Sequence, residues 1–264
     1  MVCGMTNWQR ADRPRQRIGR GVEAHASIDS TNDRARALLL EPGGEGRAIV
    51  AEEQTAGRGR RGRTWISPPG RNLMLSVAVR PRISAADAWQ LSLAAALAAR
   101  SACAALAPVA LKWPNDLVSD DGDKVGGLLL ETTIDGERVT SAVIGIGINV
   151  NWPRAEMPPE IAEGATSIGE LAGLPIDRVD LLASLLDALD AELVAVEAGR
   201  SPVARYREVC ATLGTDVGVD TTAGRVEGRA IAIDDRGALV LETTAGRVEL
   251  TSGEIVRIRS GAPA

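Results

Sequence analysis

Two apolar runs, Val125-Gly-Gly-Leu-Leu-Leu-Glu-Thr-Thr133 and Val139-Thr-Ser-Ala-Val-Ile-Gly-Ile-Gly-Ile148, stand on either side of Asp135-Gly136. An Asp-Gly pair between two strand-like runs is typical of a tight hairpin turn, because both residues tolerate the left-handed backbone that such turns require. The sequence therefore predicts two long strands joined by a hairpin.

The segments on either side of this hairpin alternate between strand and helix patterns. Residues 47–51 and 72–79 are predicted strands, and residues 33–40, 85–107 and 178–198 are predicted helices. The last helix is indicated by leucines at helical spacing, namely Leu181, Leu182, Leu185, Leu186, Leu189 and Leu193. The 85–107 helix has few charges, so we expect it to pack against the sheet on a broad face.

The pattern changes near residue 213. Short alternating runs follow at 215–219, 225–233, 238–242, 246–250 and 254–258, with glycine-containing turns between them. Five short strands at close spacing are typical of a small β-barrel. We therefore place a domain boundary at about residues 210–213.

Composition excludes several classes of protein. The chain has 264 residues, a net charge of −5 and 45% hydrophobic residues, which is ordinary for a globular protein. No apolar run approaches the roughly 20 residues that a membrane-spanning helix needs. Cys3, Cys103 and Cys210 lack metal-ligand spacing, His25 is the single histidine, and residues 1–22 form a polar arm that we expect to be flexible. These features predict a soluble, cytoplasmic protein with reduced thiols.

Lysine is rare in this chain. Of 30 basic residues, 28 are arginine, and the two lysines are Lys112 and Lys124. Lysine is a compact point charge whereas arginine is a planar fork, so a lysine kept against such a bias suggests a need for a point charge.

Residues 54–65 form a segment rich in glycine and arginine. Gly57, Gly59 and Gly62 match G-x-G-x-x-G, but the chain then enters Ser67-Pro-Pro-Gly70, which cannot begin the helix that a dinucleotide-binding fold requires. Four arginines lie in the six residues 58–63, so we expect a loop that is mobile when empty and ordered by a carboxylate or phosphate. A solvated basic loop or a nucleic-acid patch is the alternative, and the acidic chain with few aromatics disfavours the nucleic-acid patch.

Three further blocks combine glycine with polar groups. They are Lys112-Trp-Pro-Asn-Asp116, Lys124-Val-Gly-Gly-Leu-Leu-Leu-Glu131 and Gly145-Ile-Gly-Ile-Asn149. Glycines on one face of a strand leave room for a flat ligand, and the neighbouring lysines supply positive charge. Each block alone is equally consistent with a turn or a tightly packed strand.

Together with Ser30-Thr-Asn32, these blocks resemble the biotin protein ligase family in order and spacing over about residues 27–258. The resemblance implies an α+β fold, with a mixed β-sheet backed by helices at residues 23–212 and an SH3-like domain at 213–260. It also implies the monofunctional form, because an arm of 22 residues is too short for the winged-helix domain of regulatory members.

The resemblance further implies a two-step reaction in which biotin and ATP form biotinyl-5′-AMP and biotin then passes to a lysine. The resemblance assigns catalytic roles to Lys124, Arg60, Lys112 and Asp116. Ligand-binding roles fall to Ser30, Thr31, Asn32, Gln54, Gly57, Arg58, Gly59, Arg60, Trp65, Lys124, Gly126, Gly127, Gly147 and Asn149. Mg²⁺ would arrive with the ATP phosphates, with Asp116 as the candidate protein ligand.

The implied acceptor is the biotin carboxyl carrier protein domain of an acyl-CoA carboxylase, with no DNA or membrane partner, and the chain is expected to be a monomer or weak homodimer. Some members stack a tryptophan on adenine where this chain has Gly164-Ala-Thr-Ser167, so we expect a less enclosed adenine pocket. The alternatives are a lipoate or octanoate ligase on the same scaffold and a non-catalytic protein that binds an anionic cofactor.

Overall fold

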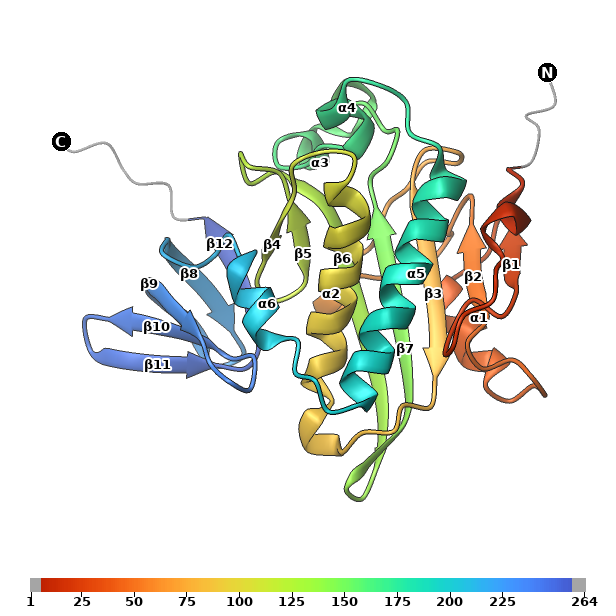
Figure 1. The fold of residues 1–264 in the computed structure, drawn as a ribbon. Helices are drawn as coiled ribbons and strands as arrows, with labels where there is room; N and C mark the ends of the chain where they lie inside the picture. The colour runs from red at the N-terminus through yellow and green to blue at the C-terminus, as the bar shows by residue number, and fades with distance from the viewer. Residues whose placement is uncertain (1–5, 258–264) are drawn as a thin grey trace.

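The computed structural model describes residues 6–257, with the side chains described as far as residue 255. Its centre is a seven-stranded sheet in the order β1-β2-β3-β7-β6-β5-β4 (Figure 1). The strands are β1 (Val22–His25), β2 (Ala48–Ala51), β3 (Leu73–Val79), β4 (Ala110–Lys112), β5 (Asp116–Val118), β6 (Lys124–Asp135) and β7 (Arg138–Ile148). β1 and β2 are parallel and the other neighbours are antiparallel, so the predicted mixed sheet is confirmed.

The β6–β7 hairpin lies at the middle of this sheet. Asp135 pairs with Arg138, and Gly136 has a φ of 54°, the left-handed conformation expected at the turn. The predicted turn is therefore confirmed.

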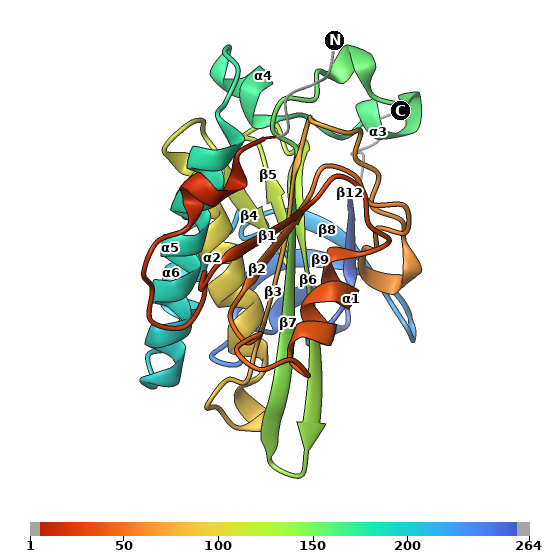
Figure 2. The same cartoon turned by 90° about the vertical axis from the view of Figure 1, so that its right-hand side faces the viewer.

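Helices cover both faces of the sheet (Figure 2). α2 (Trp89–Ala104) and α5 (Arg178–Glu197) lie on one face, and α1 (Thr31–Leu38) lies on the other. The shorter helices are η1 (Trp8–Ala11), η2 (Arg60–Gly62), η3 (Ala85–Asp87), η4 (Arg154–Glu156), α3 (Pro159–Ala162), α4 (Ile168–Ala172) and α6 (Val203–Glu208).

Strand alternation explains the layers. In β2, Val50 belongs to the large core shared with α2 and α5, whereas Ile49 packs with Leu38 of α1. None of the helices in residues 6–257 combines the length and apolar character needed to cross a lipid bilayer.

A second sheet follows near the C-terminus. Its strands are β8 (Asp216–Thr221), β9 (Gly224–Ile233), β10 (Leu239–Thr243), β11 (Gly246–Leu250) and β12 (Glu254–Arg257), in the order β11-β10-β9-β8-β12 and all antiparallel. We call it the C-terminal sheet. The five predicted strands are confirmed, while residues 258–260 of the expected domain lie outside the described residues.

The N-terminal segment differs from the flexible arm that the sequence predicts. Residues 1–5, including Cys3, lie outside the described residues, but residues 6–21 pack against the large domain. Trp8 and Ile18 are buried in the main core. The carboxylate of Asp190 on α5 accepts hydrogen bonds from the backbone N–H groups of Gln16, Arg17 and Ile18 at 3.0, 2.6 and 2.9 Å. These tertiary contacts fix a segment whose own composition is polar.

Replacing Asp190 by alanine is expected to lower the free energy of unfolding by roughly 3 kcal/mol, because three backbone donors lose their acceptor. Urea denaturation measures the loss. Ala191→Ser, on the exposed side of the same helix, is the matched control. Equal stability of the two variants would mean that Asp190 does not hold the segment.

Candidate functional site

A cavity of about 440 Å³ lies on the α1 side of the sheet, and we call it the main cavity. Its size is in the range of small-molecule sites. Most residues predicted from the sequence line it, namely Ser30, Thr31, Asn32, Gln54, Arg58, Gly59, Arg60, Trp65, Asp116, Lys124, Gly127, Gly147 and Asn149.

The floor of the main cavity crosses three strands. Met74 of β3, Gly147 of β7 and Gly127 of β6 are register partners in one row, and Ser76 and Gly145 are partners in the next. Because glycine has no side chain, the glycines of these rows leave the space that the cavity occupies. A Cβ on Gly147 would lie 2.6 Å from the Trp65 ring, and a Cβ on Gly145 would lie 2.3 Å from the Asn32 amide oxygen.

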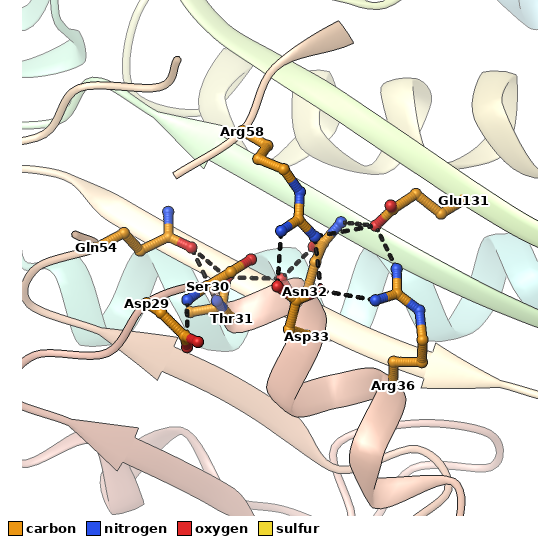
Figure 3. Close-up of polar contacts among 10 residues, drawn as sticks. Asp29, Ser30, Thr31, Asn32, Asp33, Arg36, Gln54, Arg58 and Glu131 are labelled. Carbon is orange, nitrogen blue, oxygen red and sulfur yellow. Dashed lines mark hydrogen bonds and ion pairs between the residues drawn. The ribbon is translucent and has the colours of Figure 1, made fainter. Parts of the chain in front are cut away.

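One end of the main cavity carries uncharged polar groups (Figure 3). The backbone N–H and the hydroxyl of Thr31 donate to Gln54 Oε1 at 2.8 and 2.9 Å. Ser76 Oγ lies 2.7 Å from Thr31 Oγ1 and 2.6 Å from Asn32 Oδ1, while Asn32 Nδ2 donates to Glu131 at 2.6 Å. These contacts fix amide and hydroxyl groups that suit an uncharged polar ligand.

Arg58 closes this end with a bidentate ion pair. Its two terminal nitrogens contact Asp33 at 2.6 and 2.7 Å, and Arg36 contacts the same carboxylate at 2.6 Å (Figure 3). The hydrogen bonds from Arg58 lower the pKa of Asp33 from 3.8 to about 2. The carboxylate is therefore ionised throughout the neutral range.

This shift has a defined sign for pH dependence. Because the folded pKa of Asp33 is depressed, the contribution of the Arg58–Asp33 pair is fully present above the ordinary carboxyl range and is lost as the pH falls toward about 2. We expect hydrogen exchange of loop amides 57–63, corrected for its intrinsic pH dependence, to be unchanged between pH 5 and 8. Asp33→Asn should raise this exchange rate about threefold at either pH, because a partly exposed ion pair contributes modestly to stability. Asp135→Asn at the exposed hairpin tip is the control, and equal exchange in the two variants would contradict the prediction.

The middle of the main cavity is cationic. Lys124 Nζ lies 2.7 Å from Asp116 Oδ1 and 5.9 Å from the centre of the Trp65 ring. Arg60 donates to Asn115 Oδ1 at 3.0 Å, and burial lowers its pKa from the ordinary value without removing its charge. Two positive groups thus stand beside a half-buried carboxylate, an arrangement suited to an anionic ligand.

At the other end of the main cavity, Asn149 is buried and its side chain forms hydrogen bonds with the protein backbone. Its Nδ2 donates to the carbonyl oxygens of Thr166 at 3.1 Å and Lys124 at 3.5 Å. Trp152 and Ala165 line this end and belong to one small apolar cluster. Asn149 therefore fixes the strand that carries Lys124, and Trp152 supplies a flat wall.

The structure places three predicted site residues elsewhere. Gly126 precedes Gly127 on β6, so it faces the opposite side of the sheet, where a Cβ would meet the backbone of Gly147 and Ile148. Gly57 is buried beside the Trp65 carbonyl, which a Cβ would approach to 2.6 Å. Lys112 lines a neighbouring cavity of about 190 Å³, which we call the inter-domain cavity.

Other residues of the site were missed from the sequence. Asp33 and Ser76 have no motif signal of their own, although a serine inside the apolar run Leu73–Val79 is unusual for a buried strand. Glu131 ends the block that contains Lys124, and its role as the partner of Asn32 could have been sought there.

Comparisons with known proteins agree with this geometry. Residues 24–149 match the model of the biotin/lipoate A/B protein ligase family, and residues 212–257 match that of the biotin protein ligase C terminal domain. The chain is 38% identical to the biotin--[acetyl-CoA-carboxylase] ligase of Paracoccus denitrificans over 243 residues, 87% of this chain and 98% of the relative. It is 35% identical to the bifunctional ligase/repressor BirA of Bacillus subtilis over 242 residues, 90% of this chain and 74% of the relative.

A solved structure of the biotin protein ligase from Aquifex aeolicus in complex with biotin and ATP superposes with a TM-score of 0.77 and 30% identity, covering 89% of this chain and 97% of that one. The motifs, the two sheets and the relatives therefore all indicate one family, and the chain belongs to the biotin protein ligase family.

Proposed function

We propose that this chain is an ATP-dependent biotin protein ligase that forms biotinyl-5′-AMP and then transfers biotin to a lysine of a carrier domain. The observation that carries the proposal is the position of Lys124 and Arg60 in the main cavity, between a polar end at Thr31 and Gln54 and a wall at Trp152. A cavity with this order of groups can hold two ligands and bring their anionic ends together at the cations.

In the first step, an oxygen of the biotin carboxylate attacks the α-phosphorus of ATP and pyrophosphate leaves. Two anions must approach each other, so fixed positive charge stabilises the transition state. Lys124 would lie between the carboxylate and the α-phosphate, and Arg60 would bind the oxygens of either group. Ser30, Thr31 and Gln54 would hold the ureido ring of biotin, with Arg58 closing the cavity over it.

In the second step, the neutral amine of the carrier lysine attacks the carbonyl carbon of the adenylate and AMP leaves. The ammonium form of that lysine must lose one proton before it attacks, and the nitrogen loses a second proton as the amide forms. Asp116 is the carboxylate beside Lys124, and we assign to it the orientation of the incoming amine. Closure of the loop would keep water from the mixed anhydride.

Magnesium fits this site as an ion carried by the nucleotide. Mg²⁺ is usually bound by one or two carboxylates together with substrate phosphates, and Asp116 supplies one carboxylate at the cationic centre. Within residues 6–257 no group of three or more His, Cys, Asp or Glu side chains is placed to hold a metal by itself. When bound, the ion would neutralise charge on the phosphates.

The carrier domain and the cellular location follow from the same proposal. The relative from Paracoccus denitrificans is named for acetyl-CoA carboxylase, which supports a biotin carboxyl carrier domain of an acyl-CoA carboxylase as acceptor. The described cysteines, Cys103 and Cys210, are free and buried, in keeping with a reducing cytoplasm.

The test is an assay with purified protein, ATP, Mg²⁺, radiolabelled biotin and an apo carrier domain. We expect label on the carrier that depends on ATP, and no competition from lipoate. Absence of that label would overturn the proposal, and equal competition by lipoate would favour a lipoate ligase instead.

A further inference from the structure

The arginine loop, residues Arg58–Arg63, is held by both parts of the molecule. At its start, Arg58 pairs with Asp33 of α1. Further along, Arg61 donates to the carbonyl oxygen of Asp220 at 2.9 Å, and Arg63 contacts Glu254 at 2.6 Å. Asp220 lies on β8 and Glu254 on β12, so the loop spans from α1 to the C-terminal sheet.

Each arginine of the loop has a partner, which differs from the mobile empty loop that the sequence predicts. Arg60 donates to Asn115 at 3.0 Å and to the Gly253 carbonyl oxygen at 3.4 Å. Carboxylates and carbonyls of the protein thus offset the repulsion among the guanidinium groups. Three of the four arginines contact the C-terminal sheet or the turn that precedes β12.

The backbone of the loop is bent at Arg61. Its φ is 57°, and among residues 6–257 it is the non-glycine residue with a positive φ. Such a conformation persists where the surroundings hold it. The bend lets Arg60 line the main cavity while Arg61 reaches β8. The contact with Asp220 therefore stabilises the conformation that presents Arg60 to the cationic centre.

The block that contains Asp116 contacts the turn between β9 and β10 of the same sheet. Trp113 is buried, and its indole N–H donates to the Gly237 carbonyl oxygen at 3.1 Å. The inter-domain cavity lies between this block, the loop and residues 253–255, and it shares Lys124 and Asp116 with the main cavity. The C-terminal sheet thus contacts both segments that flank the cationic centre.

We propose that the C-terminal sheet holds the arginine loop closed during adenylate formation, with Arg61, Arg63 and Glu254 as positioning residues that act through Arg60. This inference rests on the proposed ligase activity. Loosening these contacts should move Arg60 from the reacting oxygens and let water or free adenylate pass the loop.

Glu254→Gln tests the ion pair, because it keeps the size of the side chain and removes its charge. We expect the single-turnover burst of pyrophosphate release by the full chain, which follows adenylate formation, to slow about threefold to fivefold at saturating biotin. The biotin concentration at half-saturation should change less, because a partly exposed ion pair contributes modestly. Without carrier, the fraction of the biotinyl-5′-AMP that leaves the site, free or hydrolysed, should increase by a similar factor. Glu249→Gln, on β11 of the same sheet, is the matched control.

Two further variants keep the inference testable if Glu254→Gln lowers stability. Arg61→Gly removes the contact with Asp220 while glycine accepts the positive φ, and it should slow adenylation about tenfold. The charge exchange Arg63→Glu with Glu254→Arg should restore more than half of the rate lost in Glu254→Gln. A general loss of folding would not be rescued in this way.

The outcomes separate the two proposals. If the wild-type chain forms no adenylate, the proposed ligase activity fails. If the wild-type chain is active, but Glu254→Gln and Arg61→Gly match Glu249→Gln in rate and leakage, the positioning role is overturned.

Discussion

Replacing Lys124 by alanine is expected to lower the rate of adenylate formation by roughly 10²–10³-fold, because one preorganised charge at the reacting oxygens is lost. Lys124 lies at the cationic centre of the main cavity, 2.7 Å from Asp116. The variant also leaves that carboxylate without its ammonium partner, which adds repulsion against the incoming anions. Rapid-quench measurement of pyrophosphate release checks the loss directly.

Lys124→Arg separates charge from shape. The Lys124 Cε and Nζ atoms lie 3.2 Å from the position of a Cβ on Gly127, so a planar guanidinium has little room there. We expect less than a tenth of the wild-type rate. Both variants should keep the melting temperature within a few degrees of wild type, since the Lys124 side chain is one-third exposed. Near-normal turnover of Lys124→Ala would remove this residue from the mechanism.

Replacing Gly147 by alanine is expected to weaken biotin binding at least about fivefold. The new Cβ would lie 2.6 Å from the ring of Trp65, so the ring must move into the cavity or the strand must shift. Overpacking of this kind costs about 1–3 kcal/mol, which corresponds to a weakening of roughly 5- to 150-fold. Isothermal titration with biotin measures the change.

Gly164→Ala is the matched control for Gly147→Ala. Gly164 also lines the main cavity, but a Cβ there meets nothing within 4 Å. Gly147→Ala combined with Trp65→Ala should bind biotin more tightly than Gly147→Ala alone, because the clash is removed. If both glycine variants bind biotin equally, the cavity is not shaped by the contact between Gly147 and Trp65.

The local elements of the fold could be predicted from the sequence, because they depend on neighbouring residues. The leucine spacing identifies α5, and the Asp135-Gly136 turn identifies the central hairpin. The strand order could not be predicted, because pairing such as β3 with β7 joins segments about 70 residues apart. The buried N-terminal segment was missed for the same reason, since its acceptor Asp190 is far along the chain.

Most of the site could be predicted from motifs, but not the direction in which each residue faces. Strand alternation separates Gly127, which lines the main cavity, from Gly126, which does not. The contacts of the arginine loop are also long-range, because Arg63 in the loop and its partner Glu254 on β12 lie far apart in the chain. Four arginines in sequence indicate repulsion, and only the folded chain reveals the carboxylates that offset it.

The scarcity of lysine has a practical consequence for labelling. The two lysines, Lys112 and Lys124, line the inter-domain and main cavities. Apart from the α-amino group, the amines that an amine-reactive dye or resin would modify therefore lie in the site. Thiol reagents are also unsuitable for the described cysteines, because both are buried and burial raises the pKa of the Cys103 thiol to about 12. A cysteine introduced at Leu40, a residue that is 89% exposed, offers an attachment point away from both cavities.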